Sequence, residues 1–295
     1  MQRNDTTSTF EAHRQRLVRL AYRMLGSRAN AEDIVQEAWL RWRQVDESTV
    51  QDAGGYLSRI VTRLCLDEMK SARSRRETYV GEWLPEPLVE EVEEHVDADD
   101  LTLTLMLALE RLSPLERAAF LLHDVFGQSL NDIAQTLDRD PAAVRQLASR
   151  ARKNVQAAKP RFPVARDEGQ RIVQAFFAAS RSGDMQALQS LLAEDIVIRS
   201  DGGGKVLAFR NPIVGIERVV RLYAGLLRKY PASEFELLRP VTVDGLPGYI
   251  TRERGQLLQI AAFAIEDGRI AGIFITRNPD KLAQVRALIV SPSES

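Results

Sequence analysis

Cysteine and histidine are scarce in this sequence of 295 residues. Cys65 is its only cysteine, and His13, His95 and His123 are its only histidines. A single cysteine excludes an intrachain disulfide framework and a zinc site built from cysteines. The last third of the chain, from about residue 166, therefore lacks the usual general base and thiol nucleophile. Aspartates and glutamates remain there, but their spacing predicts no catalytic pair, and we expect no cofactor or metal.

Long apolar runs are missing as well. No run reaches the roughly 18 residues needed to cross a bilayer, and the first ten residues are polar, unlike a signal peptide. Apolar residues make up 44% of the chain and charged residues 27%, as in ordinary globular domains. The length suits two or three domains. We therefore expect a cytoplasmic, multidomain protein that is not an enzyme and has no membrane partner.

The net charge is only −1, but the charges are unevenly distributed. Residues 82–100 contain nine acidic side chains and no lysine or arginine, whereas residues 141–161 contain six basic side chains and no acidic one. The acidic stretch also carries Pro85 and Pro87 and has little apolar content. Such a segment cannot bury a core, which indicates a linker.

The pattern of apolar, charged and turn-forming residues divides the chain into four parts. Residues 10–80 and 101–160 are helical in pattern, with 81–100 as the acidic linker between them. From 166 to 290 the pattern changes to α+β, and a curved antiparallel sheet is the expected arrangement.

Within the α+β part, helices are expected near 168–181 and 184–192, and strands at 196–198 and 257–263. The pairs Asp244-Gly245, Pro247-Gly248 and Asp267-Gly268 are read as turns between the later strands.

The strongest physical signal is a basic helix-turn-helix pattern over 129–155. Asp138 can adopt the left-handed conformation at the break between two helices, Asp140 can cap the second helix, and Pro141 fits its first position. The second helix buries one apolar stripe and presents a basic, polar face suited to the major groove of DNA. A merely solvated amphipathic helix is the alternative interpretation. The face consists of Arg145, Gln146, Ser149, Arg150, Arg152 and Lys153.

A second well-started helix is expected over 30–42, with Asn30 as its cap. Its buried side includes Val35 and Trp42, and its opposite side is acidic and polar. On its own that polar face would be read as simply solvated.

The run 31–40 closely resembles the polymerase-binding helix of extracytoplasmic-function (ECF) sigma factors. The resemblance continues through 56–67, which is similar to the promoter-melting segment, and through 112–120 and the helix-turn-helix, which are similar to the domain that reads the −35 element. Two ordered motifs separated by a linker are more specific than either alone.

The resemblance implies a protein that is monomeric when free and that binds both promoter DNA and core RNA polymerase. The polymerase contacts would be the β′ clamp helices and the β flap. The polar loop 46–53 is where a flipped −10 base would be read, and the linker would run near the RNA path. The clamp-facing residues would be Asp33, Gln36, Glu37 and Leu40. Phosphates at the −10 region would be met by Arg59, Arg63, Lys70, Arg73, Arg75 and Arg76.

The C-terminal part, 166–290, resembles the SnoaL-like cone, a fold that does not settle function. Three short motifs can each be read structurally, as a stiff spacer (83–87), a tight turn (201–205) and a capped helix start (278–282). Together they are similar to the sigma factors with a fused SnoaL-like extension, which implies regulation in cis through contacts with the sigma domains. The motif residues are Trp83, Pro85, Pro87, Asp201, Gly202, Gly203, Gly204, Lys205, Asn278, Pro279, Asp280, Lys281 and Leu282.

Two other functions stay open at this point. One is a helix-turn-helix regulator whose C-terminal domain senses a small molecule, against which the run 31–40 argues. The other is a bifunctional chain whose cone turns over a small molecule. The sequence does not say whether the cone binds a ligand, or whether it inhibits or assists.

Overall fold

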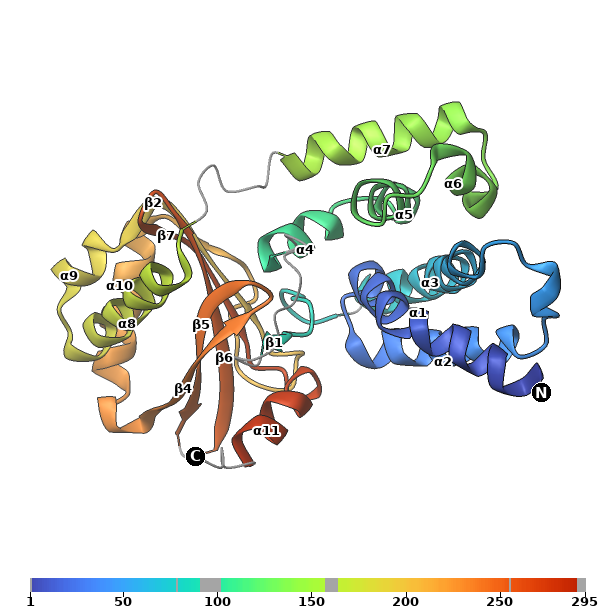
Figure 1. Ribbon diagram of the computed structural model, residues 1–295. Helices are drawn as coiled ribbons and strands as arrows, with labels where there is room; N and C mark the ends of the chain where they lie inside the picture. The colour runs from blue at the N-terminus through green and yellow to red at the C-terminus, as the bar shows by residue number, and fades with distance from the viewer. Residues whose placement is uncertain (1, 78, 91–101, 157–163, 255, 291–295) are drawn as a thin grey trace. The chain divides into compact units, whose positions relative to one another are not determined.

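The computed structural model describes residues 2–77, 79–90, 102–156, 164–254 and 256–290, and the backbone alone at 2–5, 72–77, 90 and 290. It divides into two compact units (Figure 1). The first comprises residues 1–78 and 105–158, and the second comprises 79–104 and 159–295. The segment that joins the two helical parts of the first unit thus belongs to the second unit.

The N-terminal part of the first unit is a bundle built around Trp42. Trp42 is fully buried, and its indole N–H donates to the carbonyl of Thr6 over 3.1 Å. The expected cap at Asn30 is wrong: Ser27 caps the helix, because its side chain accepts from the Asn30 N–H and the helix begins at Arg28. In chain order the elements are α1 (Gln2–Leu25), α2 (Arg28–Trp42), the short η1 (Glu47–Thr49) and α3 (Ala53–Glu77).

The second helical part contains the helix-turn-helix. Asp138 has a φ of 53° at the turn, and the Asp140 carboxylate accepts from the Ala143 N–H over 2.8 Å. Both features confirm the expected turn and cap. The elements are α4 (Leu103–Glu110), α5 (Pro114–Phe120), the π-helical η2 (Leu121–Val125), α6 (Leu130–Leu137) and α7 (Pro141–Gln156).

An arginine joins the two helical parts. Arg117 is only 1% exposed, yet its guanidinium is satisfied by the carbonyls of Met24 and Leu109, at 2.7 and 3.0 Å, and by Glu110 at 2.7 Å. Because a buried charge is tolerated only when it is paired and hydrogen-bonded, this side chain fixes α5 against the end of α1.

The second unit is built on a mixed sheet, which confirms an α+β fold. Seven described strands lie in one sheet. The sheet is antiparallel except where β2 and β7 run parallel. The pair Pro247-Gly248, expected as a turn, instead lies inside β5, and Gly248 is there because a Cβ would meet the Ala261 carbonyl of the next strand at 2.2 Å. In spatial order the strands are β1 (Val89–Glu90), β4 (Phe235–Val243), β5 (Leu246–Glu253), β6 (Leu257–Glu266), β7 (Arg269–Thr276), β2 (Leu192–Asp201) and β3 (Ile213–Val214).

One side of the sheet forms the apolar core with the helices. Phe176 of α8 contacts Phe263 of β6 and Tyr223 of α10, with ring centroids 5.2 and 5.3 Å apart. Edge-to-face pairs of this kind stabilise a core beyond the area they bury. The helices of the unit are α8 (Arg166–Ser182), α9 (Met185–Ser190), α10 (Ile216–Lys229) and α11 (Ala283–Val290), with the short η3 (Ala232–Glu234) and η4 (Pro279–Lys281).

The N-terminal half of the acidic linker is part of this unit. Leu84 is 1% exposed and Glu86 8%, and β1 adds to the sheet edge beside β4. The segment is expected to be a linker without a core of its own, and the structure adds that residues 84–90 dock on the core of the second unit. Residues 91–100 lie outside the described part. Among the described helices, none is long and apolar enough to cross a membrane.

Cys65 provides a test of this packing. Its side chain is fully buried in α3, and burial raises the pKa of the thiol. Since the thiolate is the reactive form, we expect a disulfide reagent at pH 8 to label the native protein at least about 100-fold more slowly than the urea-unfolded protein. Labelling at equal rates would contradict the packing of α3.

Candidate functional site

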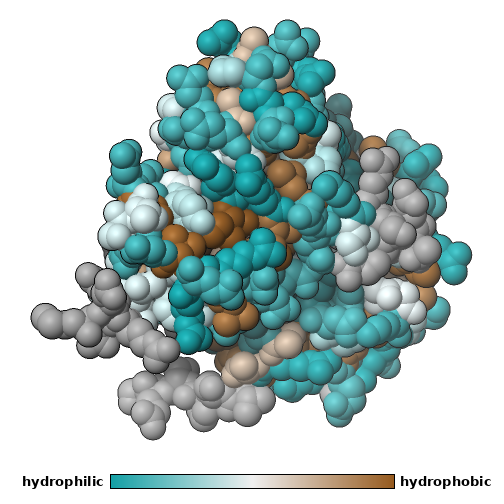
Figure 2. All heavy atoms as spheres, turned by 90° about the vertical axis from the view of Figure 1, so that its right-hand side faces the viewer, coloured by the Kyte–Doolittle hydropathy of each residue, from teal (hydrophilic) through white to brown (hydrophobic). Residues whose placement is uncertain are grey.

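The predicted polymerase-binding face lies on α2. Asp33, Gln36 and Leu40 are exposed, and Glu37 is partly exposed and bonded to Arg41 at 3.0 Å. Leu40 keeps 44% of its surface accessible. Figure 2 looks onto the helices of the first unit and shows mostly hydrophilic side chains with a short hydrophobic band. The four side chains are thus available on the surface of this unit.

Two of the predicted −10 residues are already engaged inside the first unit. Arg63 donates to the backbone carbonyls of Thr136 and Gln135, both at 3.1 Å. Arg59 donates to the side-chain oxygen of Gln135 at 3.0 Å. These acceptors lie at the end of α6, where the last carbonyls of a helix have no partner within it.

The remaining predicted −10 residues are Lys70 and three arginines. Lys70 is exposed and bonded to Asp67 at 2.8 Å. The side chains of Arg73, Arg75 and Arg76 lie outside the described part of the chain.

The recognition helix α7 presents the predicted basic face to solvent. Two arginines on it are held by acids from neighbouring elements: Arg152 by Asp124 at 2.5 Å and Arg150 by Glu116 at 3.2 Å. Hydrogen bonds from Ser113 lower the pKa of Glu116, which keeps that carboxylate charged beside Arg150. The exposed remainder is Arg145, Gln146, Ser149 and Lys153.

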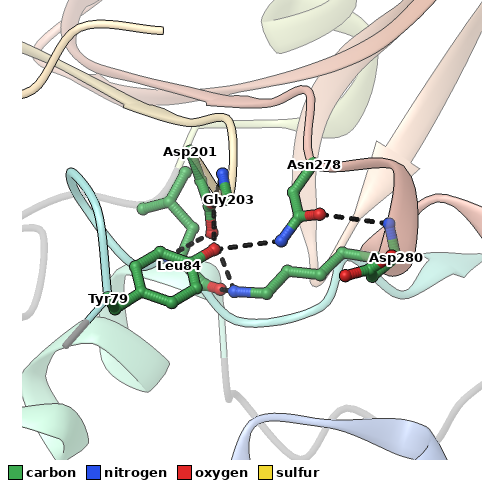
Figure 3. Close-up of polar contacts among 7 residues, drawn as sticks. Tyr79, Leu84, Asp201, Gly203, Asn278 and Asp280 are labelled. Carbon is green, nitrogen blue, oxygen red and sulfur yellow. Dashed lines mark hydrogen bonds and ion pairs between the residues drawn. The ribbon is translucent and has the colours of Figure 1, made fainter. Parts of the chain in front are cut away.

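The three short motifs meet in the second unit, at the carboxylate of Asp201 (Figure 3). One of its oxygens accepts from the Tyr79 hydroxyl at 2.6 Å and the Gly203 N–H at 3.0 Å. The other accepts from the Leu84 N–H at 2.9 Å and the Lys281 ammonium at 2.7 Å. Asp201 is fully buried, and four donors match the four lone-pair sites of a carboxylate.

Lys281 connects the linker to the last motif. Its ammonium lies 4.2 Å from the ring centroid of Trp83 and 5.3 Å from that of Tyr79, and it also donates to the carbonyl of Leu84 at 2.5 Å. Aromatic faces attract a cation most when it is removed from water, so the two rings help to hold the Lys281 side chain in this position. Pro85 and Pro87 are buried, as is Leu282.

The glycine loop needs its glycines. Gly203 and Gly204 have φ values of 63° and 70°, and a Cβ on Gly203 would lie 2.5 Å from the side chain of Asn278. A Cβ on Gly202 would lie 2.4 Å from the Val206 carbonyl. Asn278 uses the space to donate to the Tyr79 hydroxyl at 3.0 Å, while its oxygen caps the turn at Asp280, beside Pro279.

Tyr79 and the pair Arg199–Glu82 are parts of this site that the sequence did not reveal. The Arg199 guanidinium on β2 binds Glu82 of the linker at 2.6 Å. Burial, with the hydrogen bond to Asp201, raises the pKa of Tyr79. Tyr79 stands directly before the linker as drawn from sequence, and no turn or charge pattern singled it out.

These observations describe contacts between the linker and the motifs of the C-terminal part. Within the described residues, no group of three or more histidine, cysteine, aspartate or glutamate side chains could hold a metal. A helix-turn-helix with an exposed basic face, a second helical region packed on it and a fused α+β domain define a DNA-binding transcription factor with an appended domain.

Comparisons with known proteins identify the family. Models for sigma-70 region 2, sigma-70 region 4 and a SnoaL-like domain match residues 9–75, 102–155 and 173–273. The ECF RNA polymerase sigma factor SigJ of Mycobacterium tuberculosis is 39% identical over 289 residues, covering 93% of this chain and 92% of that protein. The probable sigma factor SigI of the same species is 33% identical over 294 residues, covering 97% and 98%.

The crystal structure of SigJ has the same architecture, with a TM-score of 0.77, 37% identity and coverage of 94% and 98%. The chain belongs to the ECF RNA polymerase sigma factors. It is a transcription initiation factor that binds core polymerase and promoter DNA, and it carries a C-terminal SnoaL-like domain. The alternative of a helix-turn-helix regulator without a polymerase-binding region is not supported.

Two lysine–aspartate pairs test the buried network. Lys281–Asp201 is nearly inaccessible to solvent, with side chains 13% and 0% exposed, whereas Lys205–Asp280 has side chains 55% and 61% exposed. Lys281→Met should cost about 3 kcal/mol, because it leaves a buried carboxylate without its cation. Lys205→Met should cost less than about 1 kcal/mol.

The measurement is urea unfolding of the full chain, followed by far-ultraviolet circular dichroism. The double variant Asp201→Asn, Lys281→Met should recover part of the loss, because it removes the charge left unpaired. Equal effects of the two single lysine substitutions would contradict the network.

Proposed function

We propose that the C-terminal domain regulates the sigma factor in cis by binding the linker between regions 2 and 4. The observation that carries this proposal is the Asp201 carboxylate, which accepts from Tyr79 and Leu84 on the linker side and from Lys281 of the last motif. A linker held in this way limits the separations and orientations that the two regions can adopt. Because the two regions bind different parts of a promoter, such a limit changes promoter binding.

Contacts inside the first unit support the same mechanism. Arg59 and Arg63 direct N–H groups to Gln135 and Thr136 of region 4, and these groups are not available to DNA phosphates while the contacts persist. We infer that promoter melting requires the two regions to separate. A domain that restrains the linker acts on this separation.

Specific surfaces are assigned to the two partners. We assign polymerase binding to Asp33, Gln36, Glu37 and Leu40, which includes an exposed leucine beside acidic groups. We assign −35 recognition to the recognition helix, with Arg145, Gln146, Ser149 and Lys153 as the side chains that meet DNA and Arg150 and Arg152 as residues oriented by Glu116 and Asp124. Charged pairs to neighbouring elements reduce the freedom of an arginine before DNA arrives.

For the C-terminal domain we propose a binding role without catalysis. The side chains of its two motifs, 201–205 and 278–282, are used for one another and for the segment around Tyr79 and the linker. The core between sheet and helices holds Tyr223 and Tyr249, and burial raises the pKa of both hydroxyls.

Removal of residues 166–295 tests regulation in cis. We expect the affinity of residues 1–165 for core polymerase to differ from that of the full chain by about 5- to 150-fold, the usual range of coupling between sites. An increase means that the C-terminal domain restrains the regions, and a decrease means that it assists them. Unchanged affinity together with unchanged transcription, in a truncated chain shown to be helical by circular dichroism, would contradict the proposal.

A charge reversal tests the polymerase-binding face. Asp33→Arg places a cation at the centre of the exposed face of α2 and should weaken binding of the full chain to core polymerase by at least about 10-fold, since like charge at a contact costs several kcal/mol. Asp67→Arg is the control, because Asp67 is an exposed aspartate of the same unit, on α3. Fluorescence anisotropy of labelled protein measures both affinities, and equal weakening would place the contact elsewhere.

A further inference from the structure

Two hairpins of the sheet turn on the same dipeptide but differ in what surrounds it. Asp244-Gly245 connects β4 to β5, and Asp267-Gly268 connects β6 to β7. The φ values are 44° and 72° in the first turn and 49° and 73° in the second. An Asp-Gly pair with two positive φ values is the usual two-residue hairpin turn. Asp267 is exposed as expected of such a turn, whereas Asp244 is only 7% exposed.

The N-terminal half of the linker covers Asp244. The Asp244 N–H donates to the carbonyl of Leu88 at 2.9 Å, and the Asp244 carboxylate accepts from the Leu88 N–H at 3.2 Å. Directly after this contact, Val89 and Glu90 pair with Val243 and Thr242. The linker therefore joins the sheet at the turn and extends along the end of β4.

The C-terminal end of the linker meets the same turn. The carbonyl of Asp244 accepts from the N–H of Leu103 at 3.0 Å, and Leu103 is the first residue of α4. A Cβ on Gly245 would lie 3.4 Å from the side chain of Thr102. The described residues on both sides of 91–101 are thus bound to one turn.

A hairpin turn has no need of these contacts, as the second turn demonstrates. Asp267 has the same backbone geometry, and its side chain is exposed. The N–H and carboxylate of Asp244 bind Leu88 of the linker, and its carbonyl binds Leu103 at the start of α4. The contact therefore serves the linker rather than the folding of the sheet.

We propose that the turn Asp244-Gly245 is a second clasp, which binds the linker on both sides of residues 91–101 and so couples regions 2 and 4 to the C-terminal domain. The network at Asp201 holds residues of the segment 79–84, on the side of region 2. The second clasp holds the start of α4, on the side of region 4. This inference rests on the proposed regulation in cis and adds to it a residue outside the three motifs.

Hydrogen exchange in the full chain tests the clasp directly. Asp244→Gly keeps the turn, because glycine adopts its backbone conformation freely, and removes the carboxylate that binds Leu88. Asp267→Gly makes the same change where no linker lies. We expect Asp244→Gly to accelerate exchange of the peptide 85–90 by about tenfold, as for loss of a buried hydrogen bond, and Asp267→Gly to leave it unchanged. Equal exchange in the two variants would overturn the clasp.

A second pair of variants tests the side of region 4. Leu103→Pro removes the N–H that binds Asp244 at a position where a helix tolerates proline, and Leu103→Ala controls for the lost side chain. We expect proline, beyond the effect of alanine, to change core polymerase affinity in the same direction as Asp244→Gly and as removal of residues 166–295.

The outcomes separate this inference from the proposed function. If the truncated chain binds polymerase differently from the full chain but Asp244→Gly and Leu103→Pro do not, coupling through the turn is overturned and regulation in cis stands. If the truncated chain also behaves like the full chain, regulation in cis fails, and so does any coupling by the clasp. Faster exchange at 85–90 with altered affinity supports the inference.

Discussion

A single buried carboxylate organises the C-terminal unit of this protein. Asp201 lies at the end of β2, fully buried, and a charge in such a place must have partners. Its partners come from the linker, from the glycine loop and from the last motif. Its carbonyl in addition accepts from the N–H groups of Arg277 and Asn278, at 2.8 and 3.0 Å. Segments about 80 and 120 residues apart in the chain therefore meet at Asp201. If one of them dissociates, polar groups of the others lose their hydrogen-bond partners.

Contacts of a different strength hold the two sigma regions together in the first unit. Arg63 and Arg59 reach region 4 through hydrogen bonds at partly exposed positions, and Arg117 makes a buried one. Exposed pairs contribute little net stability because water competes for both partners. Arg59 and Arg63 are therefore held by contacts for which solvent competes, whereas the linker is held at Asp201 by buried contacts.

The sequence predicted those parts of the fold that follow from local rules. The helix-turn-helix was readable because Asp138, Asp140 and Pro141 each have a strong conformational preference. The three motifs were readable through resemblance, but their partners were not. Nothing in the sequence around Tyr79 distinguishes a hydroxyl that binds Asp201 from one that faces solvent. The burial of Arg117 was not predictable either, because one of its hydrogen-bond partners is a carbonyl 93 residues earlier in the chain.

The errors have a common physical origin in long-range docking. Composition indicates that residues 82–100 cannot form a core of their own, but it does not reveal an existing sheet edge on which residues 84–90 can dock, with Val89 and Glu90 paired to β4. Pro247-Gly248 has the composition of a turn but lies in β5, where the neighbouring strand leaves no room for a Cβ. Asp244-Gly245 and Asp267-Gly268 are the sharpest case, since identical dipeptides with nearly identical φ values differ only in what covers them.

A domain that binds the linker needs a smaller contact surface than a domain that blocks polymerase or DNA directly. A domain that competed directly with polymerase or DNA would have to cover large, charged surfaces, and its affinity would depend on salt. The linker is instead connected covalently to both regions, so binding the linker restricts both of them. Because this binding is intramolecular, the effective concentration of the linker at its site does not fall on dilution. A few buried hydrogen bonds and one ion pair then suffice to shift the equilibrium between joined and separated regions, because a shift is set by the difference in free energy between the two states and not by the size of the surface that is covered.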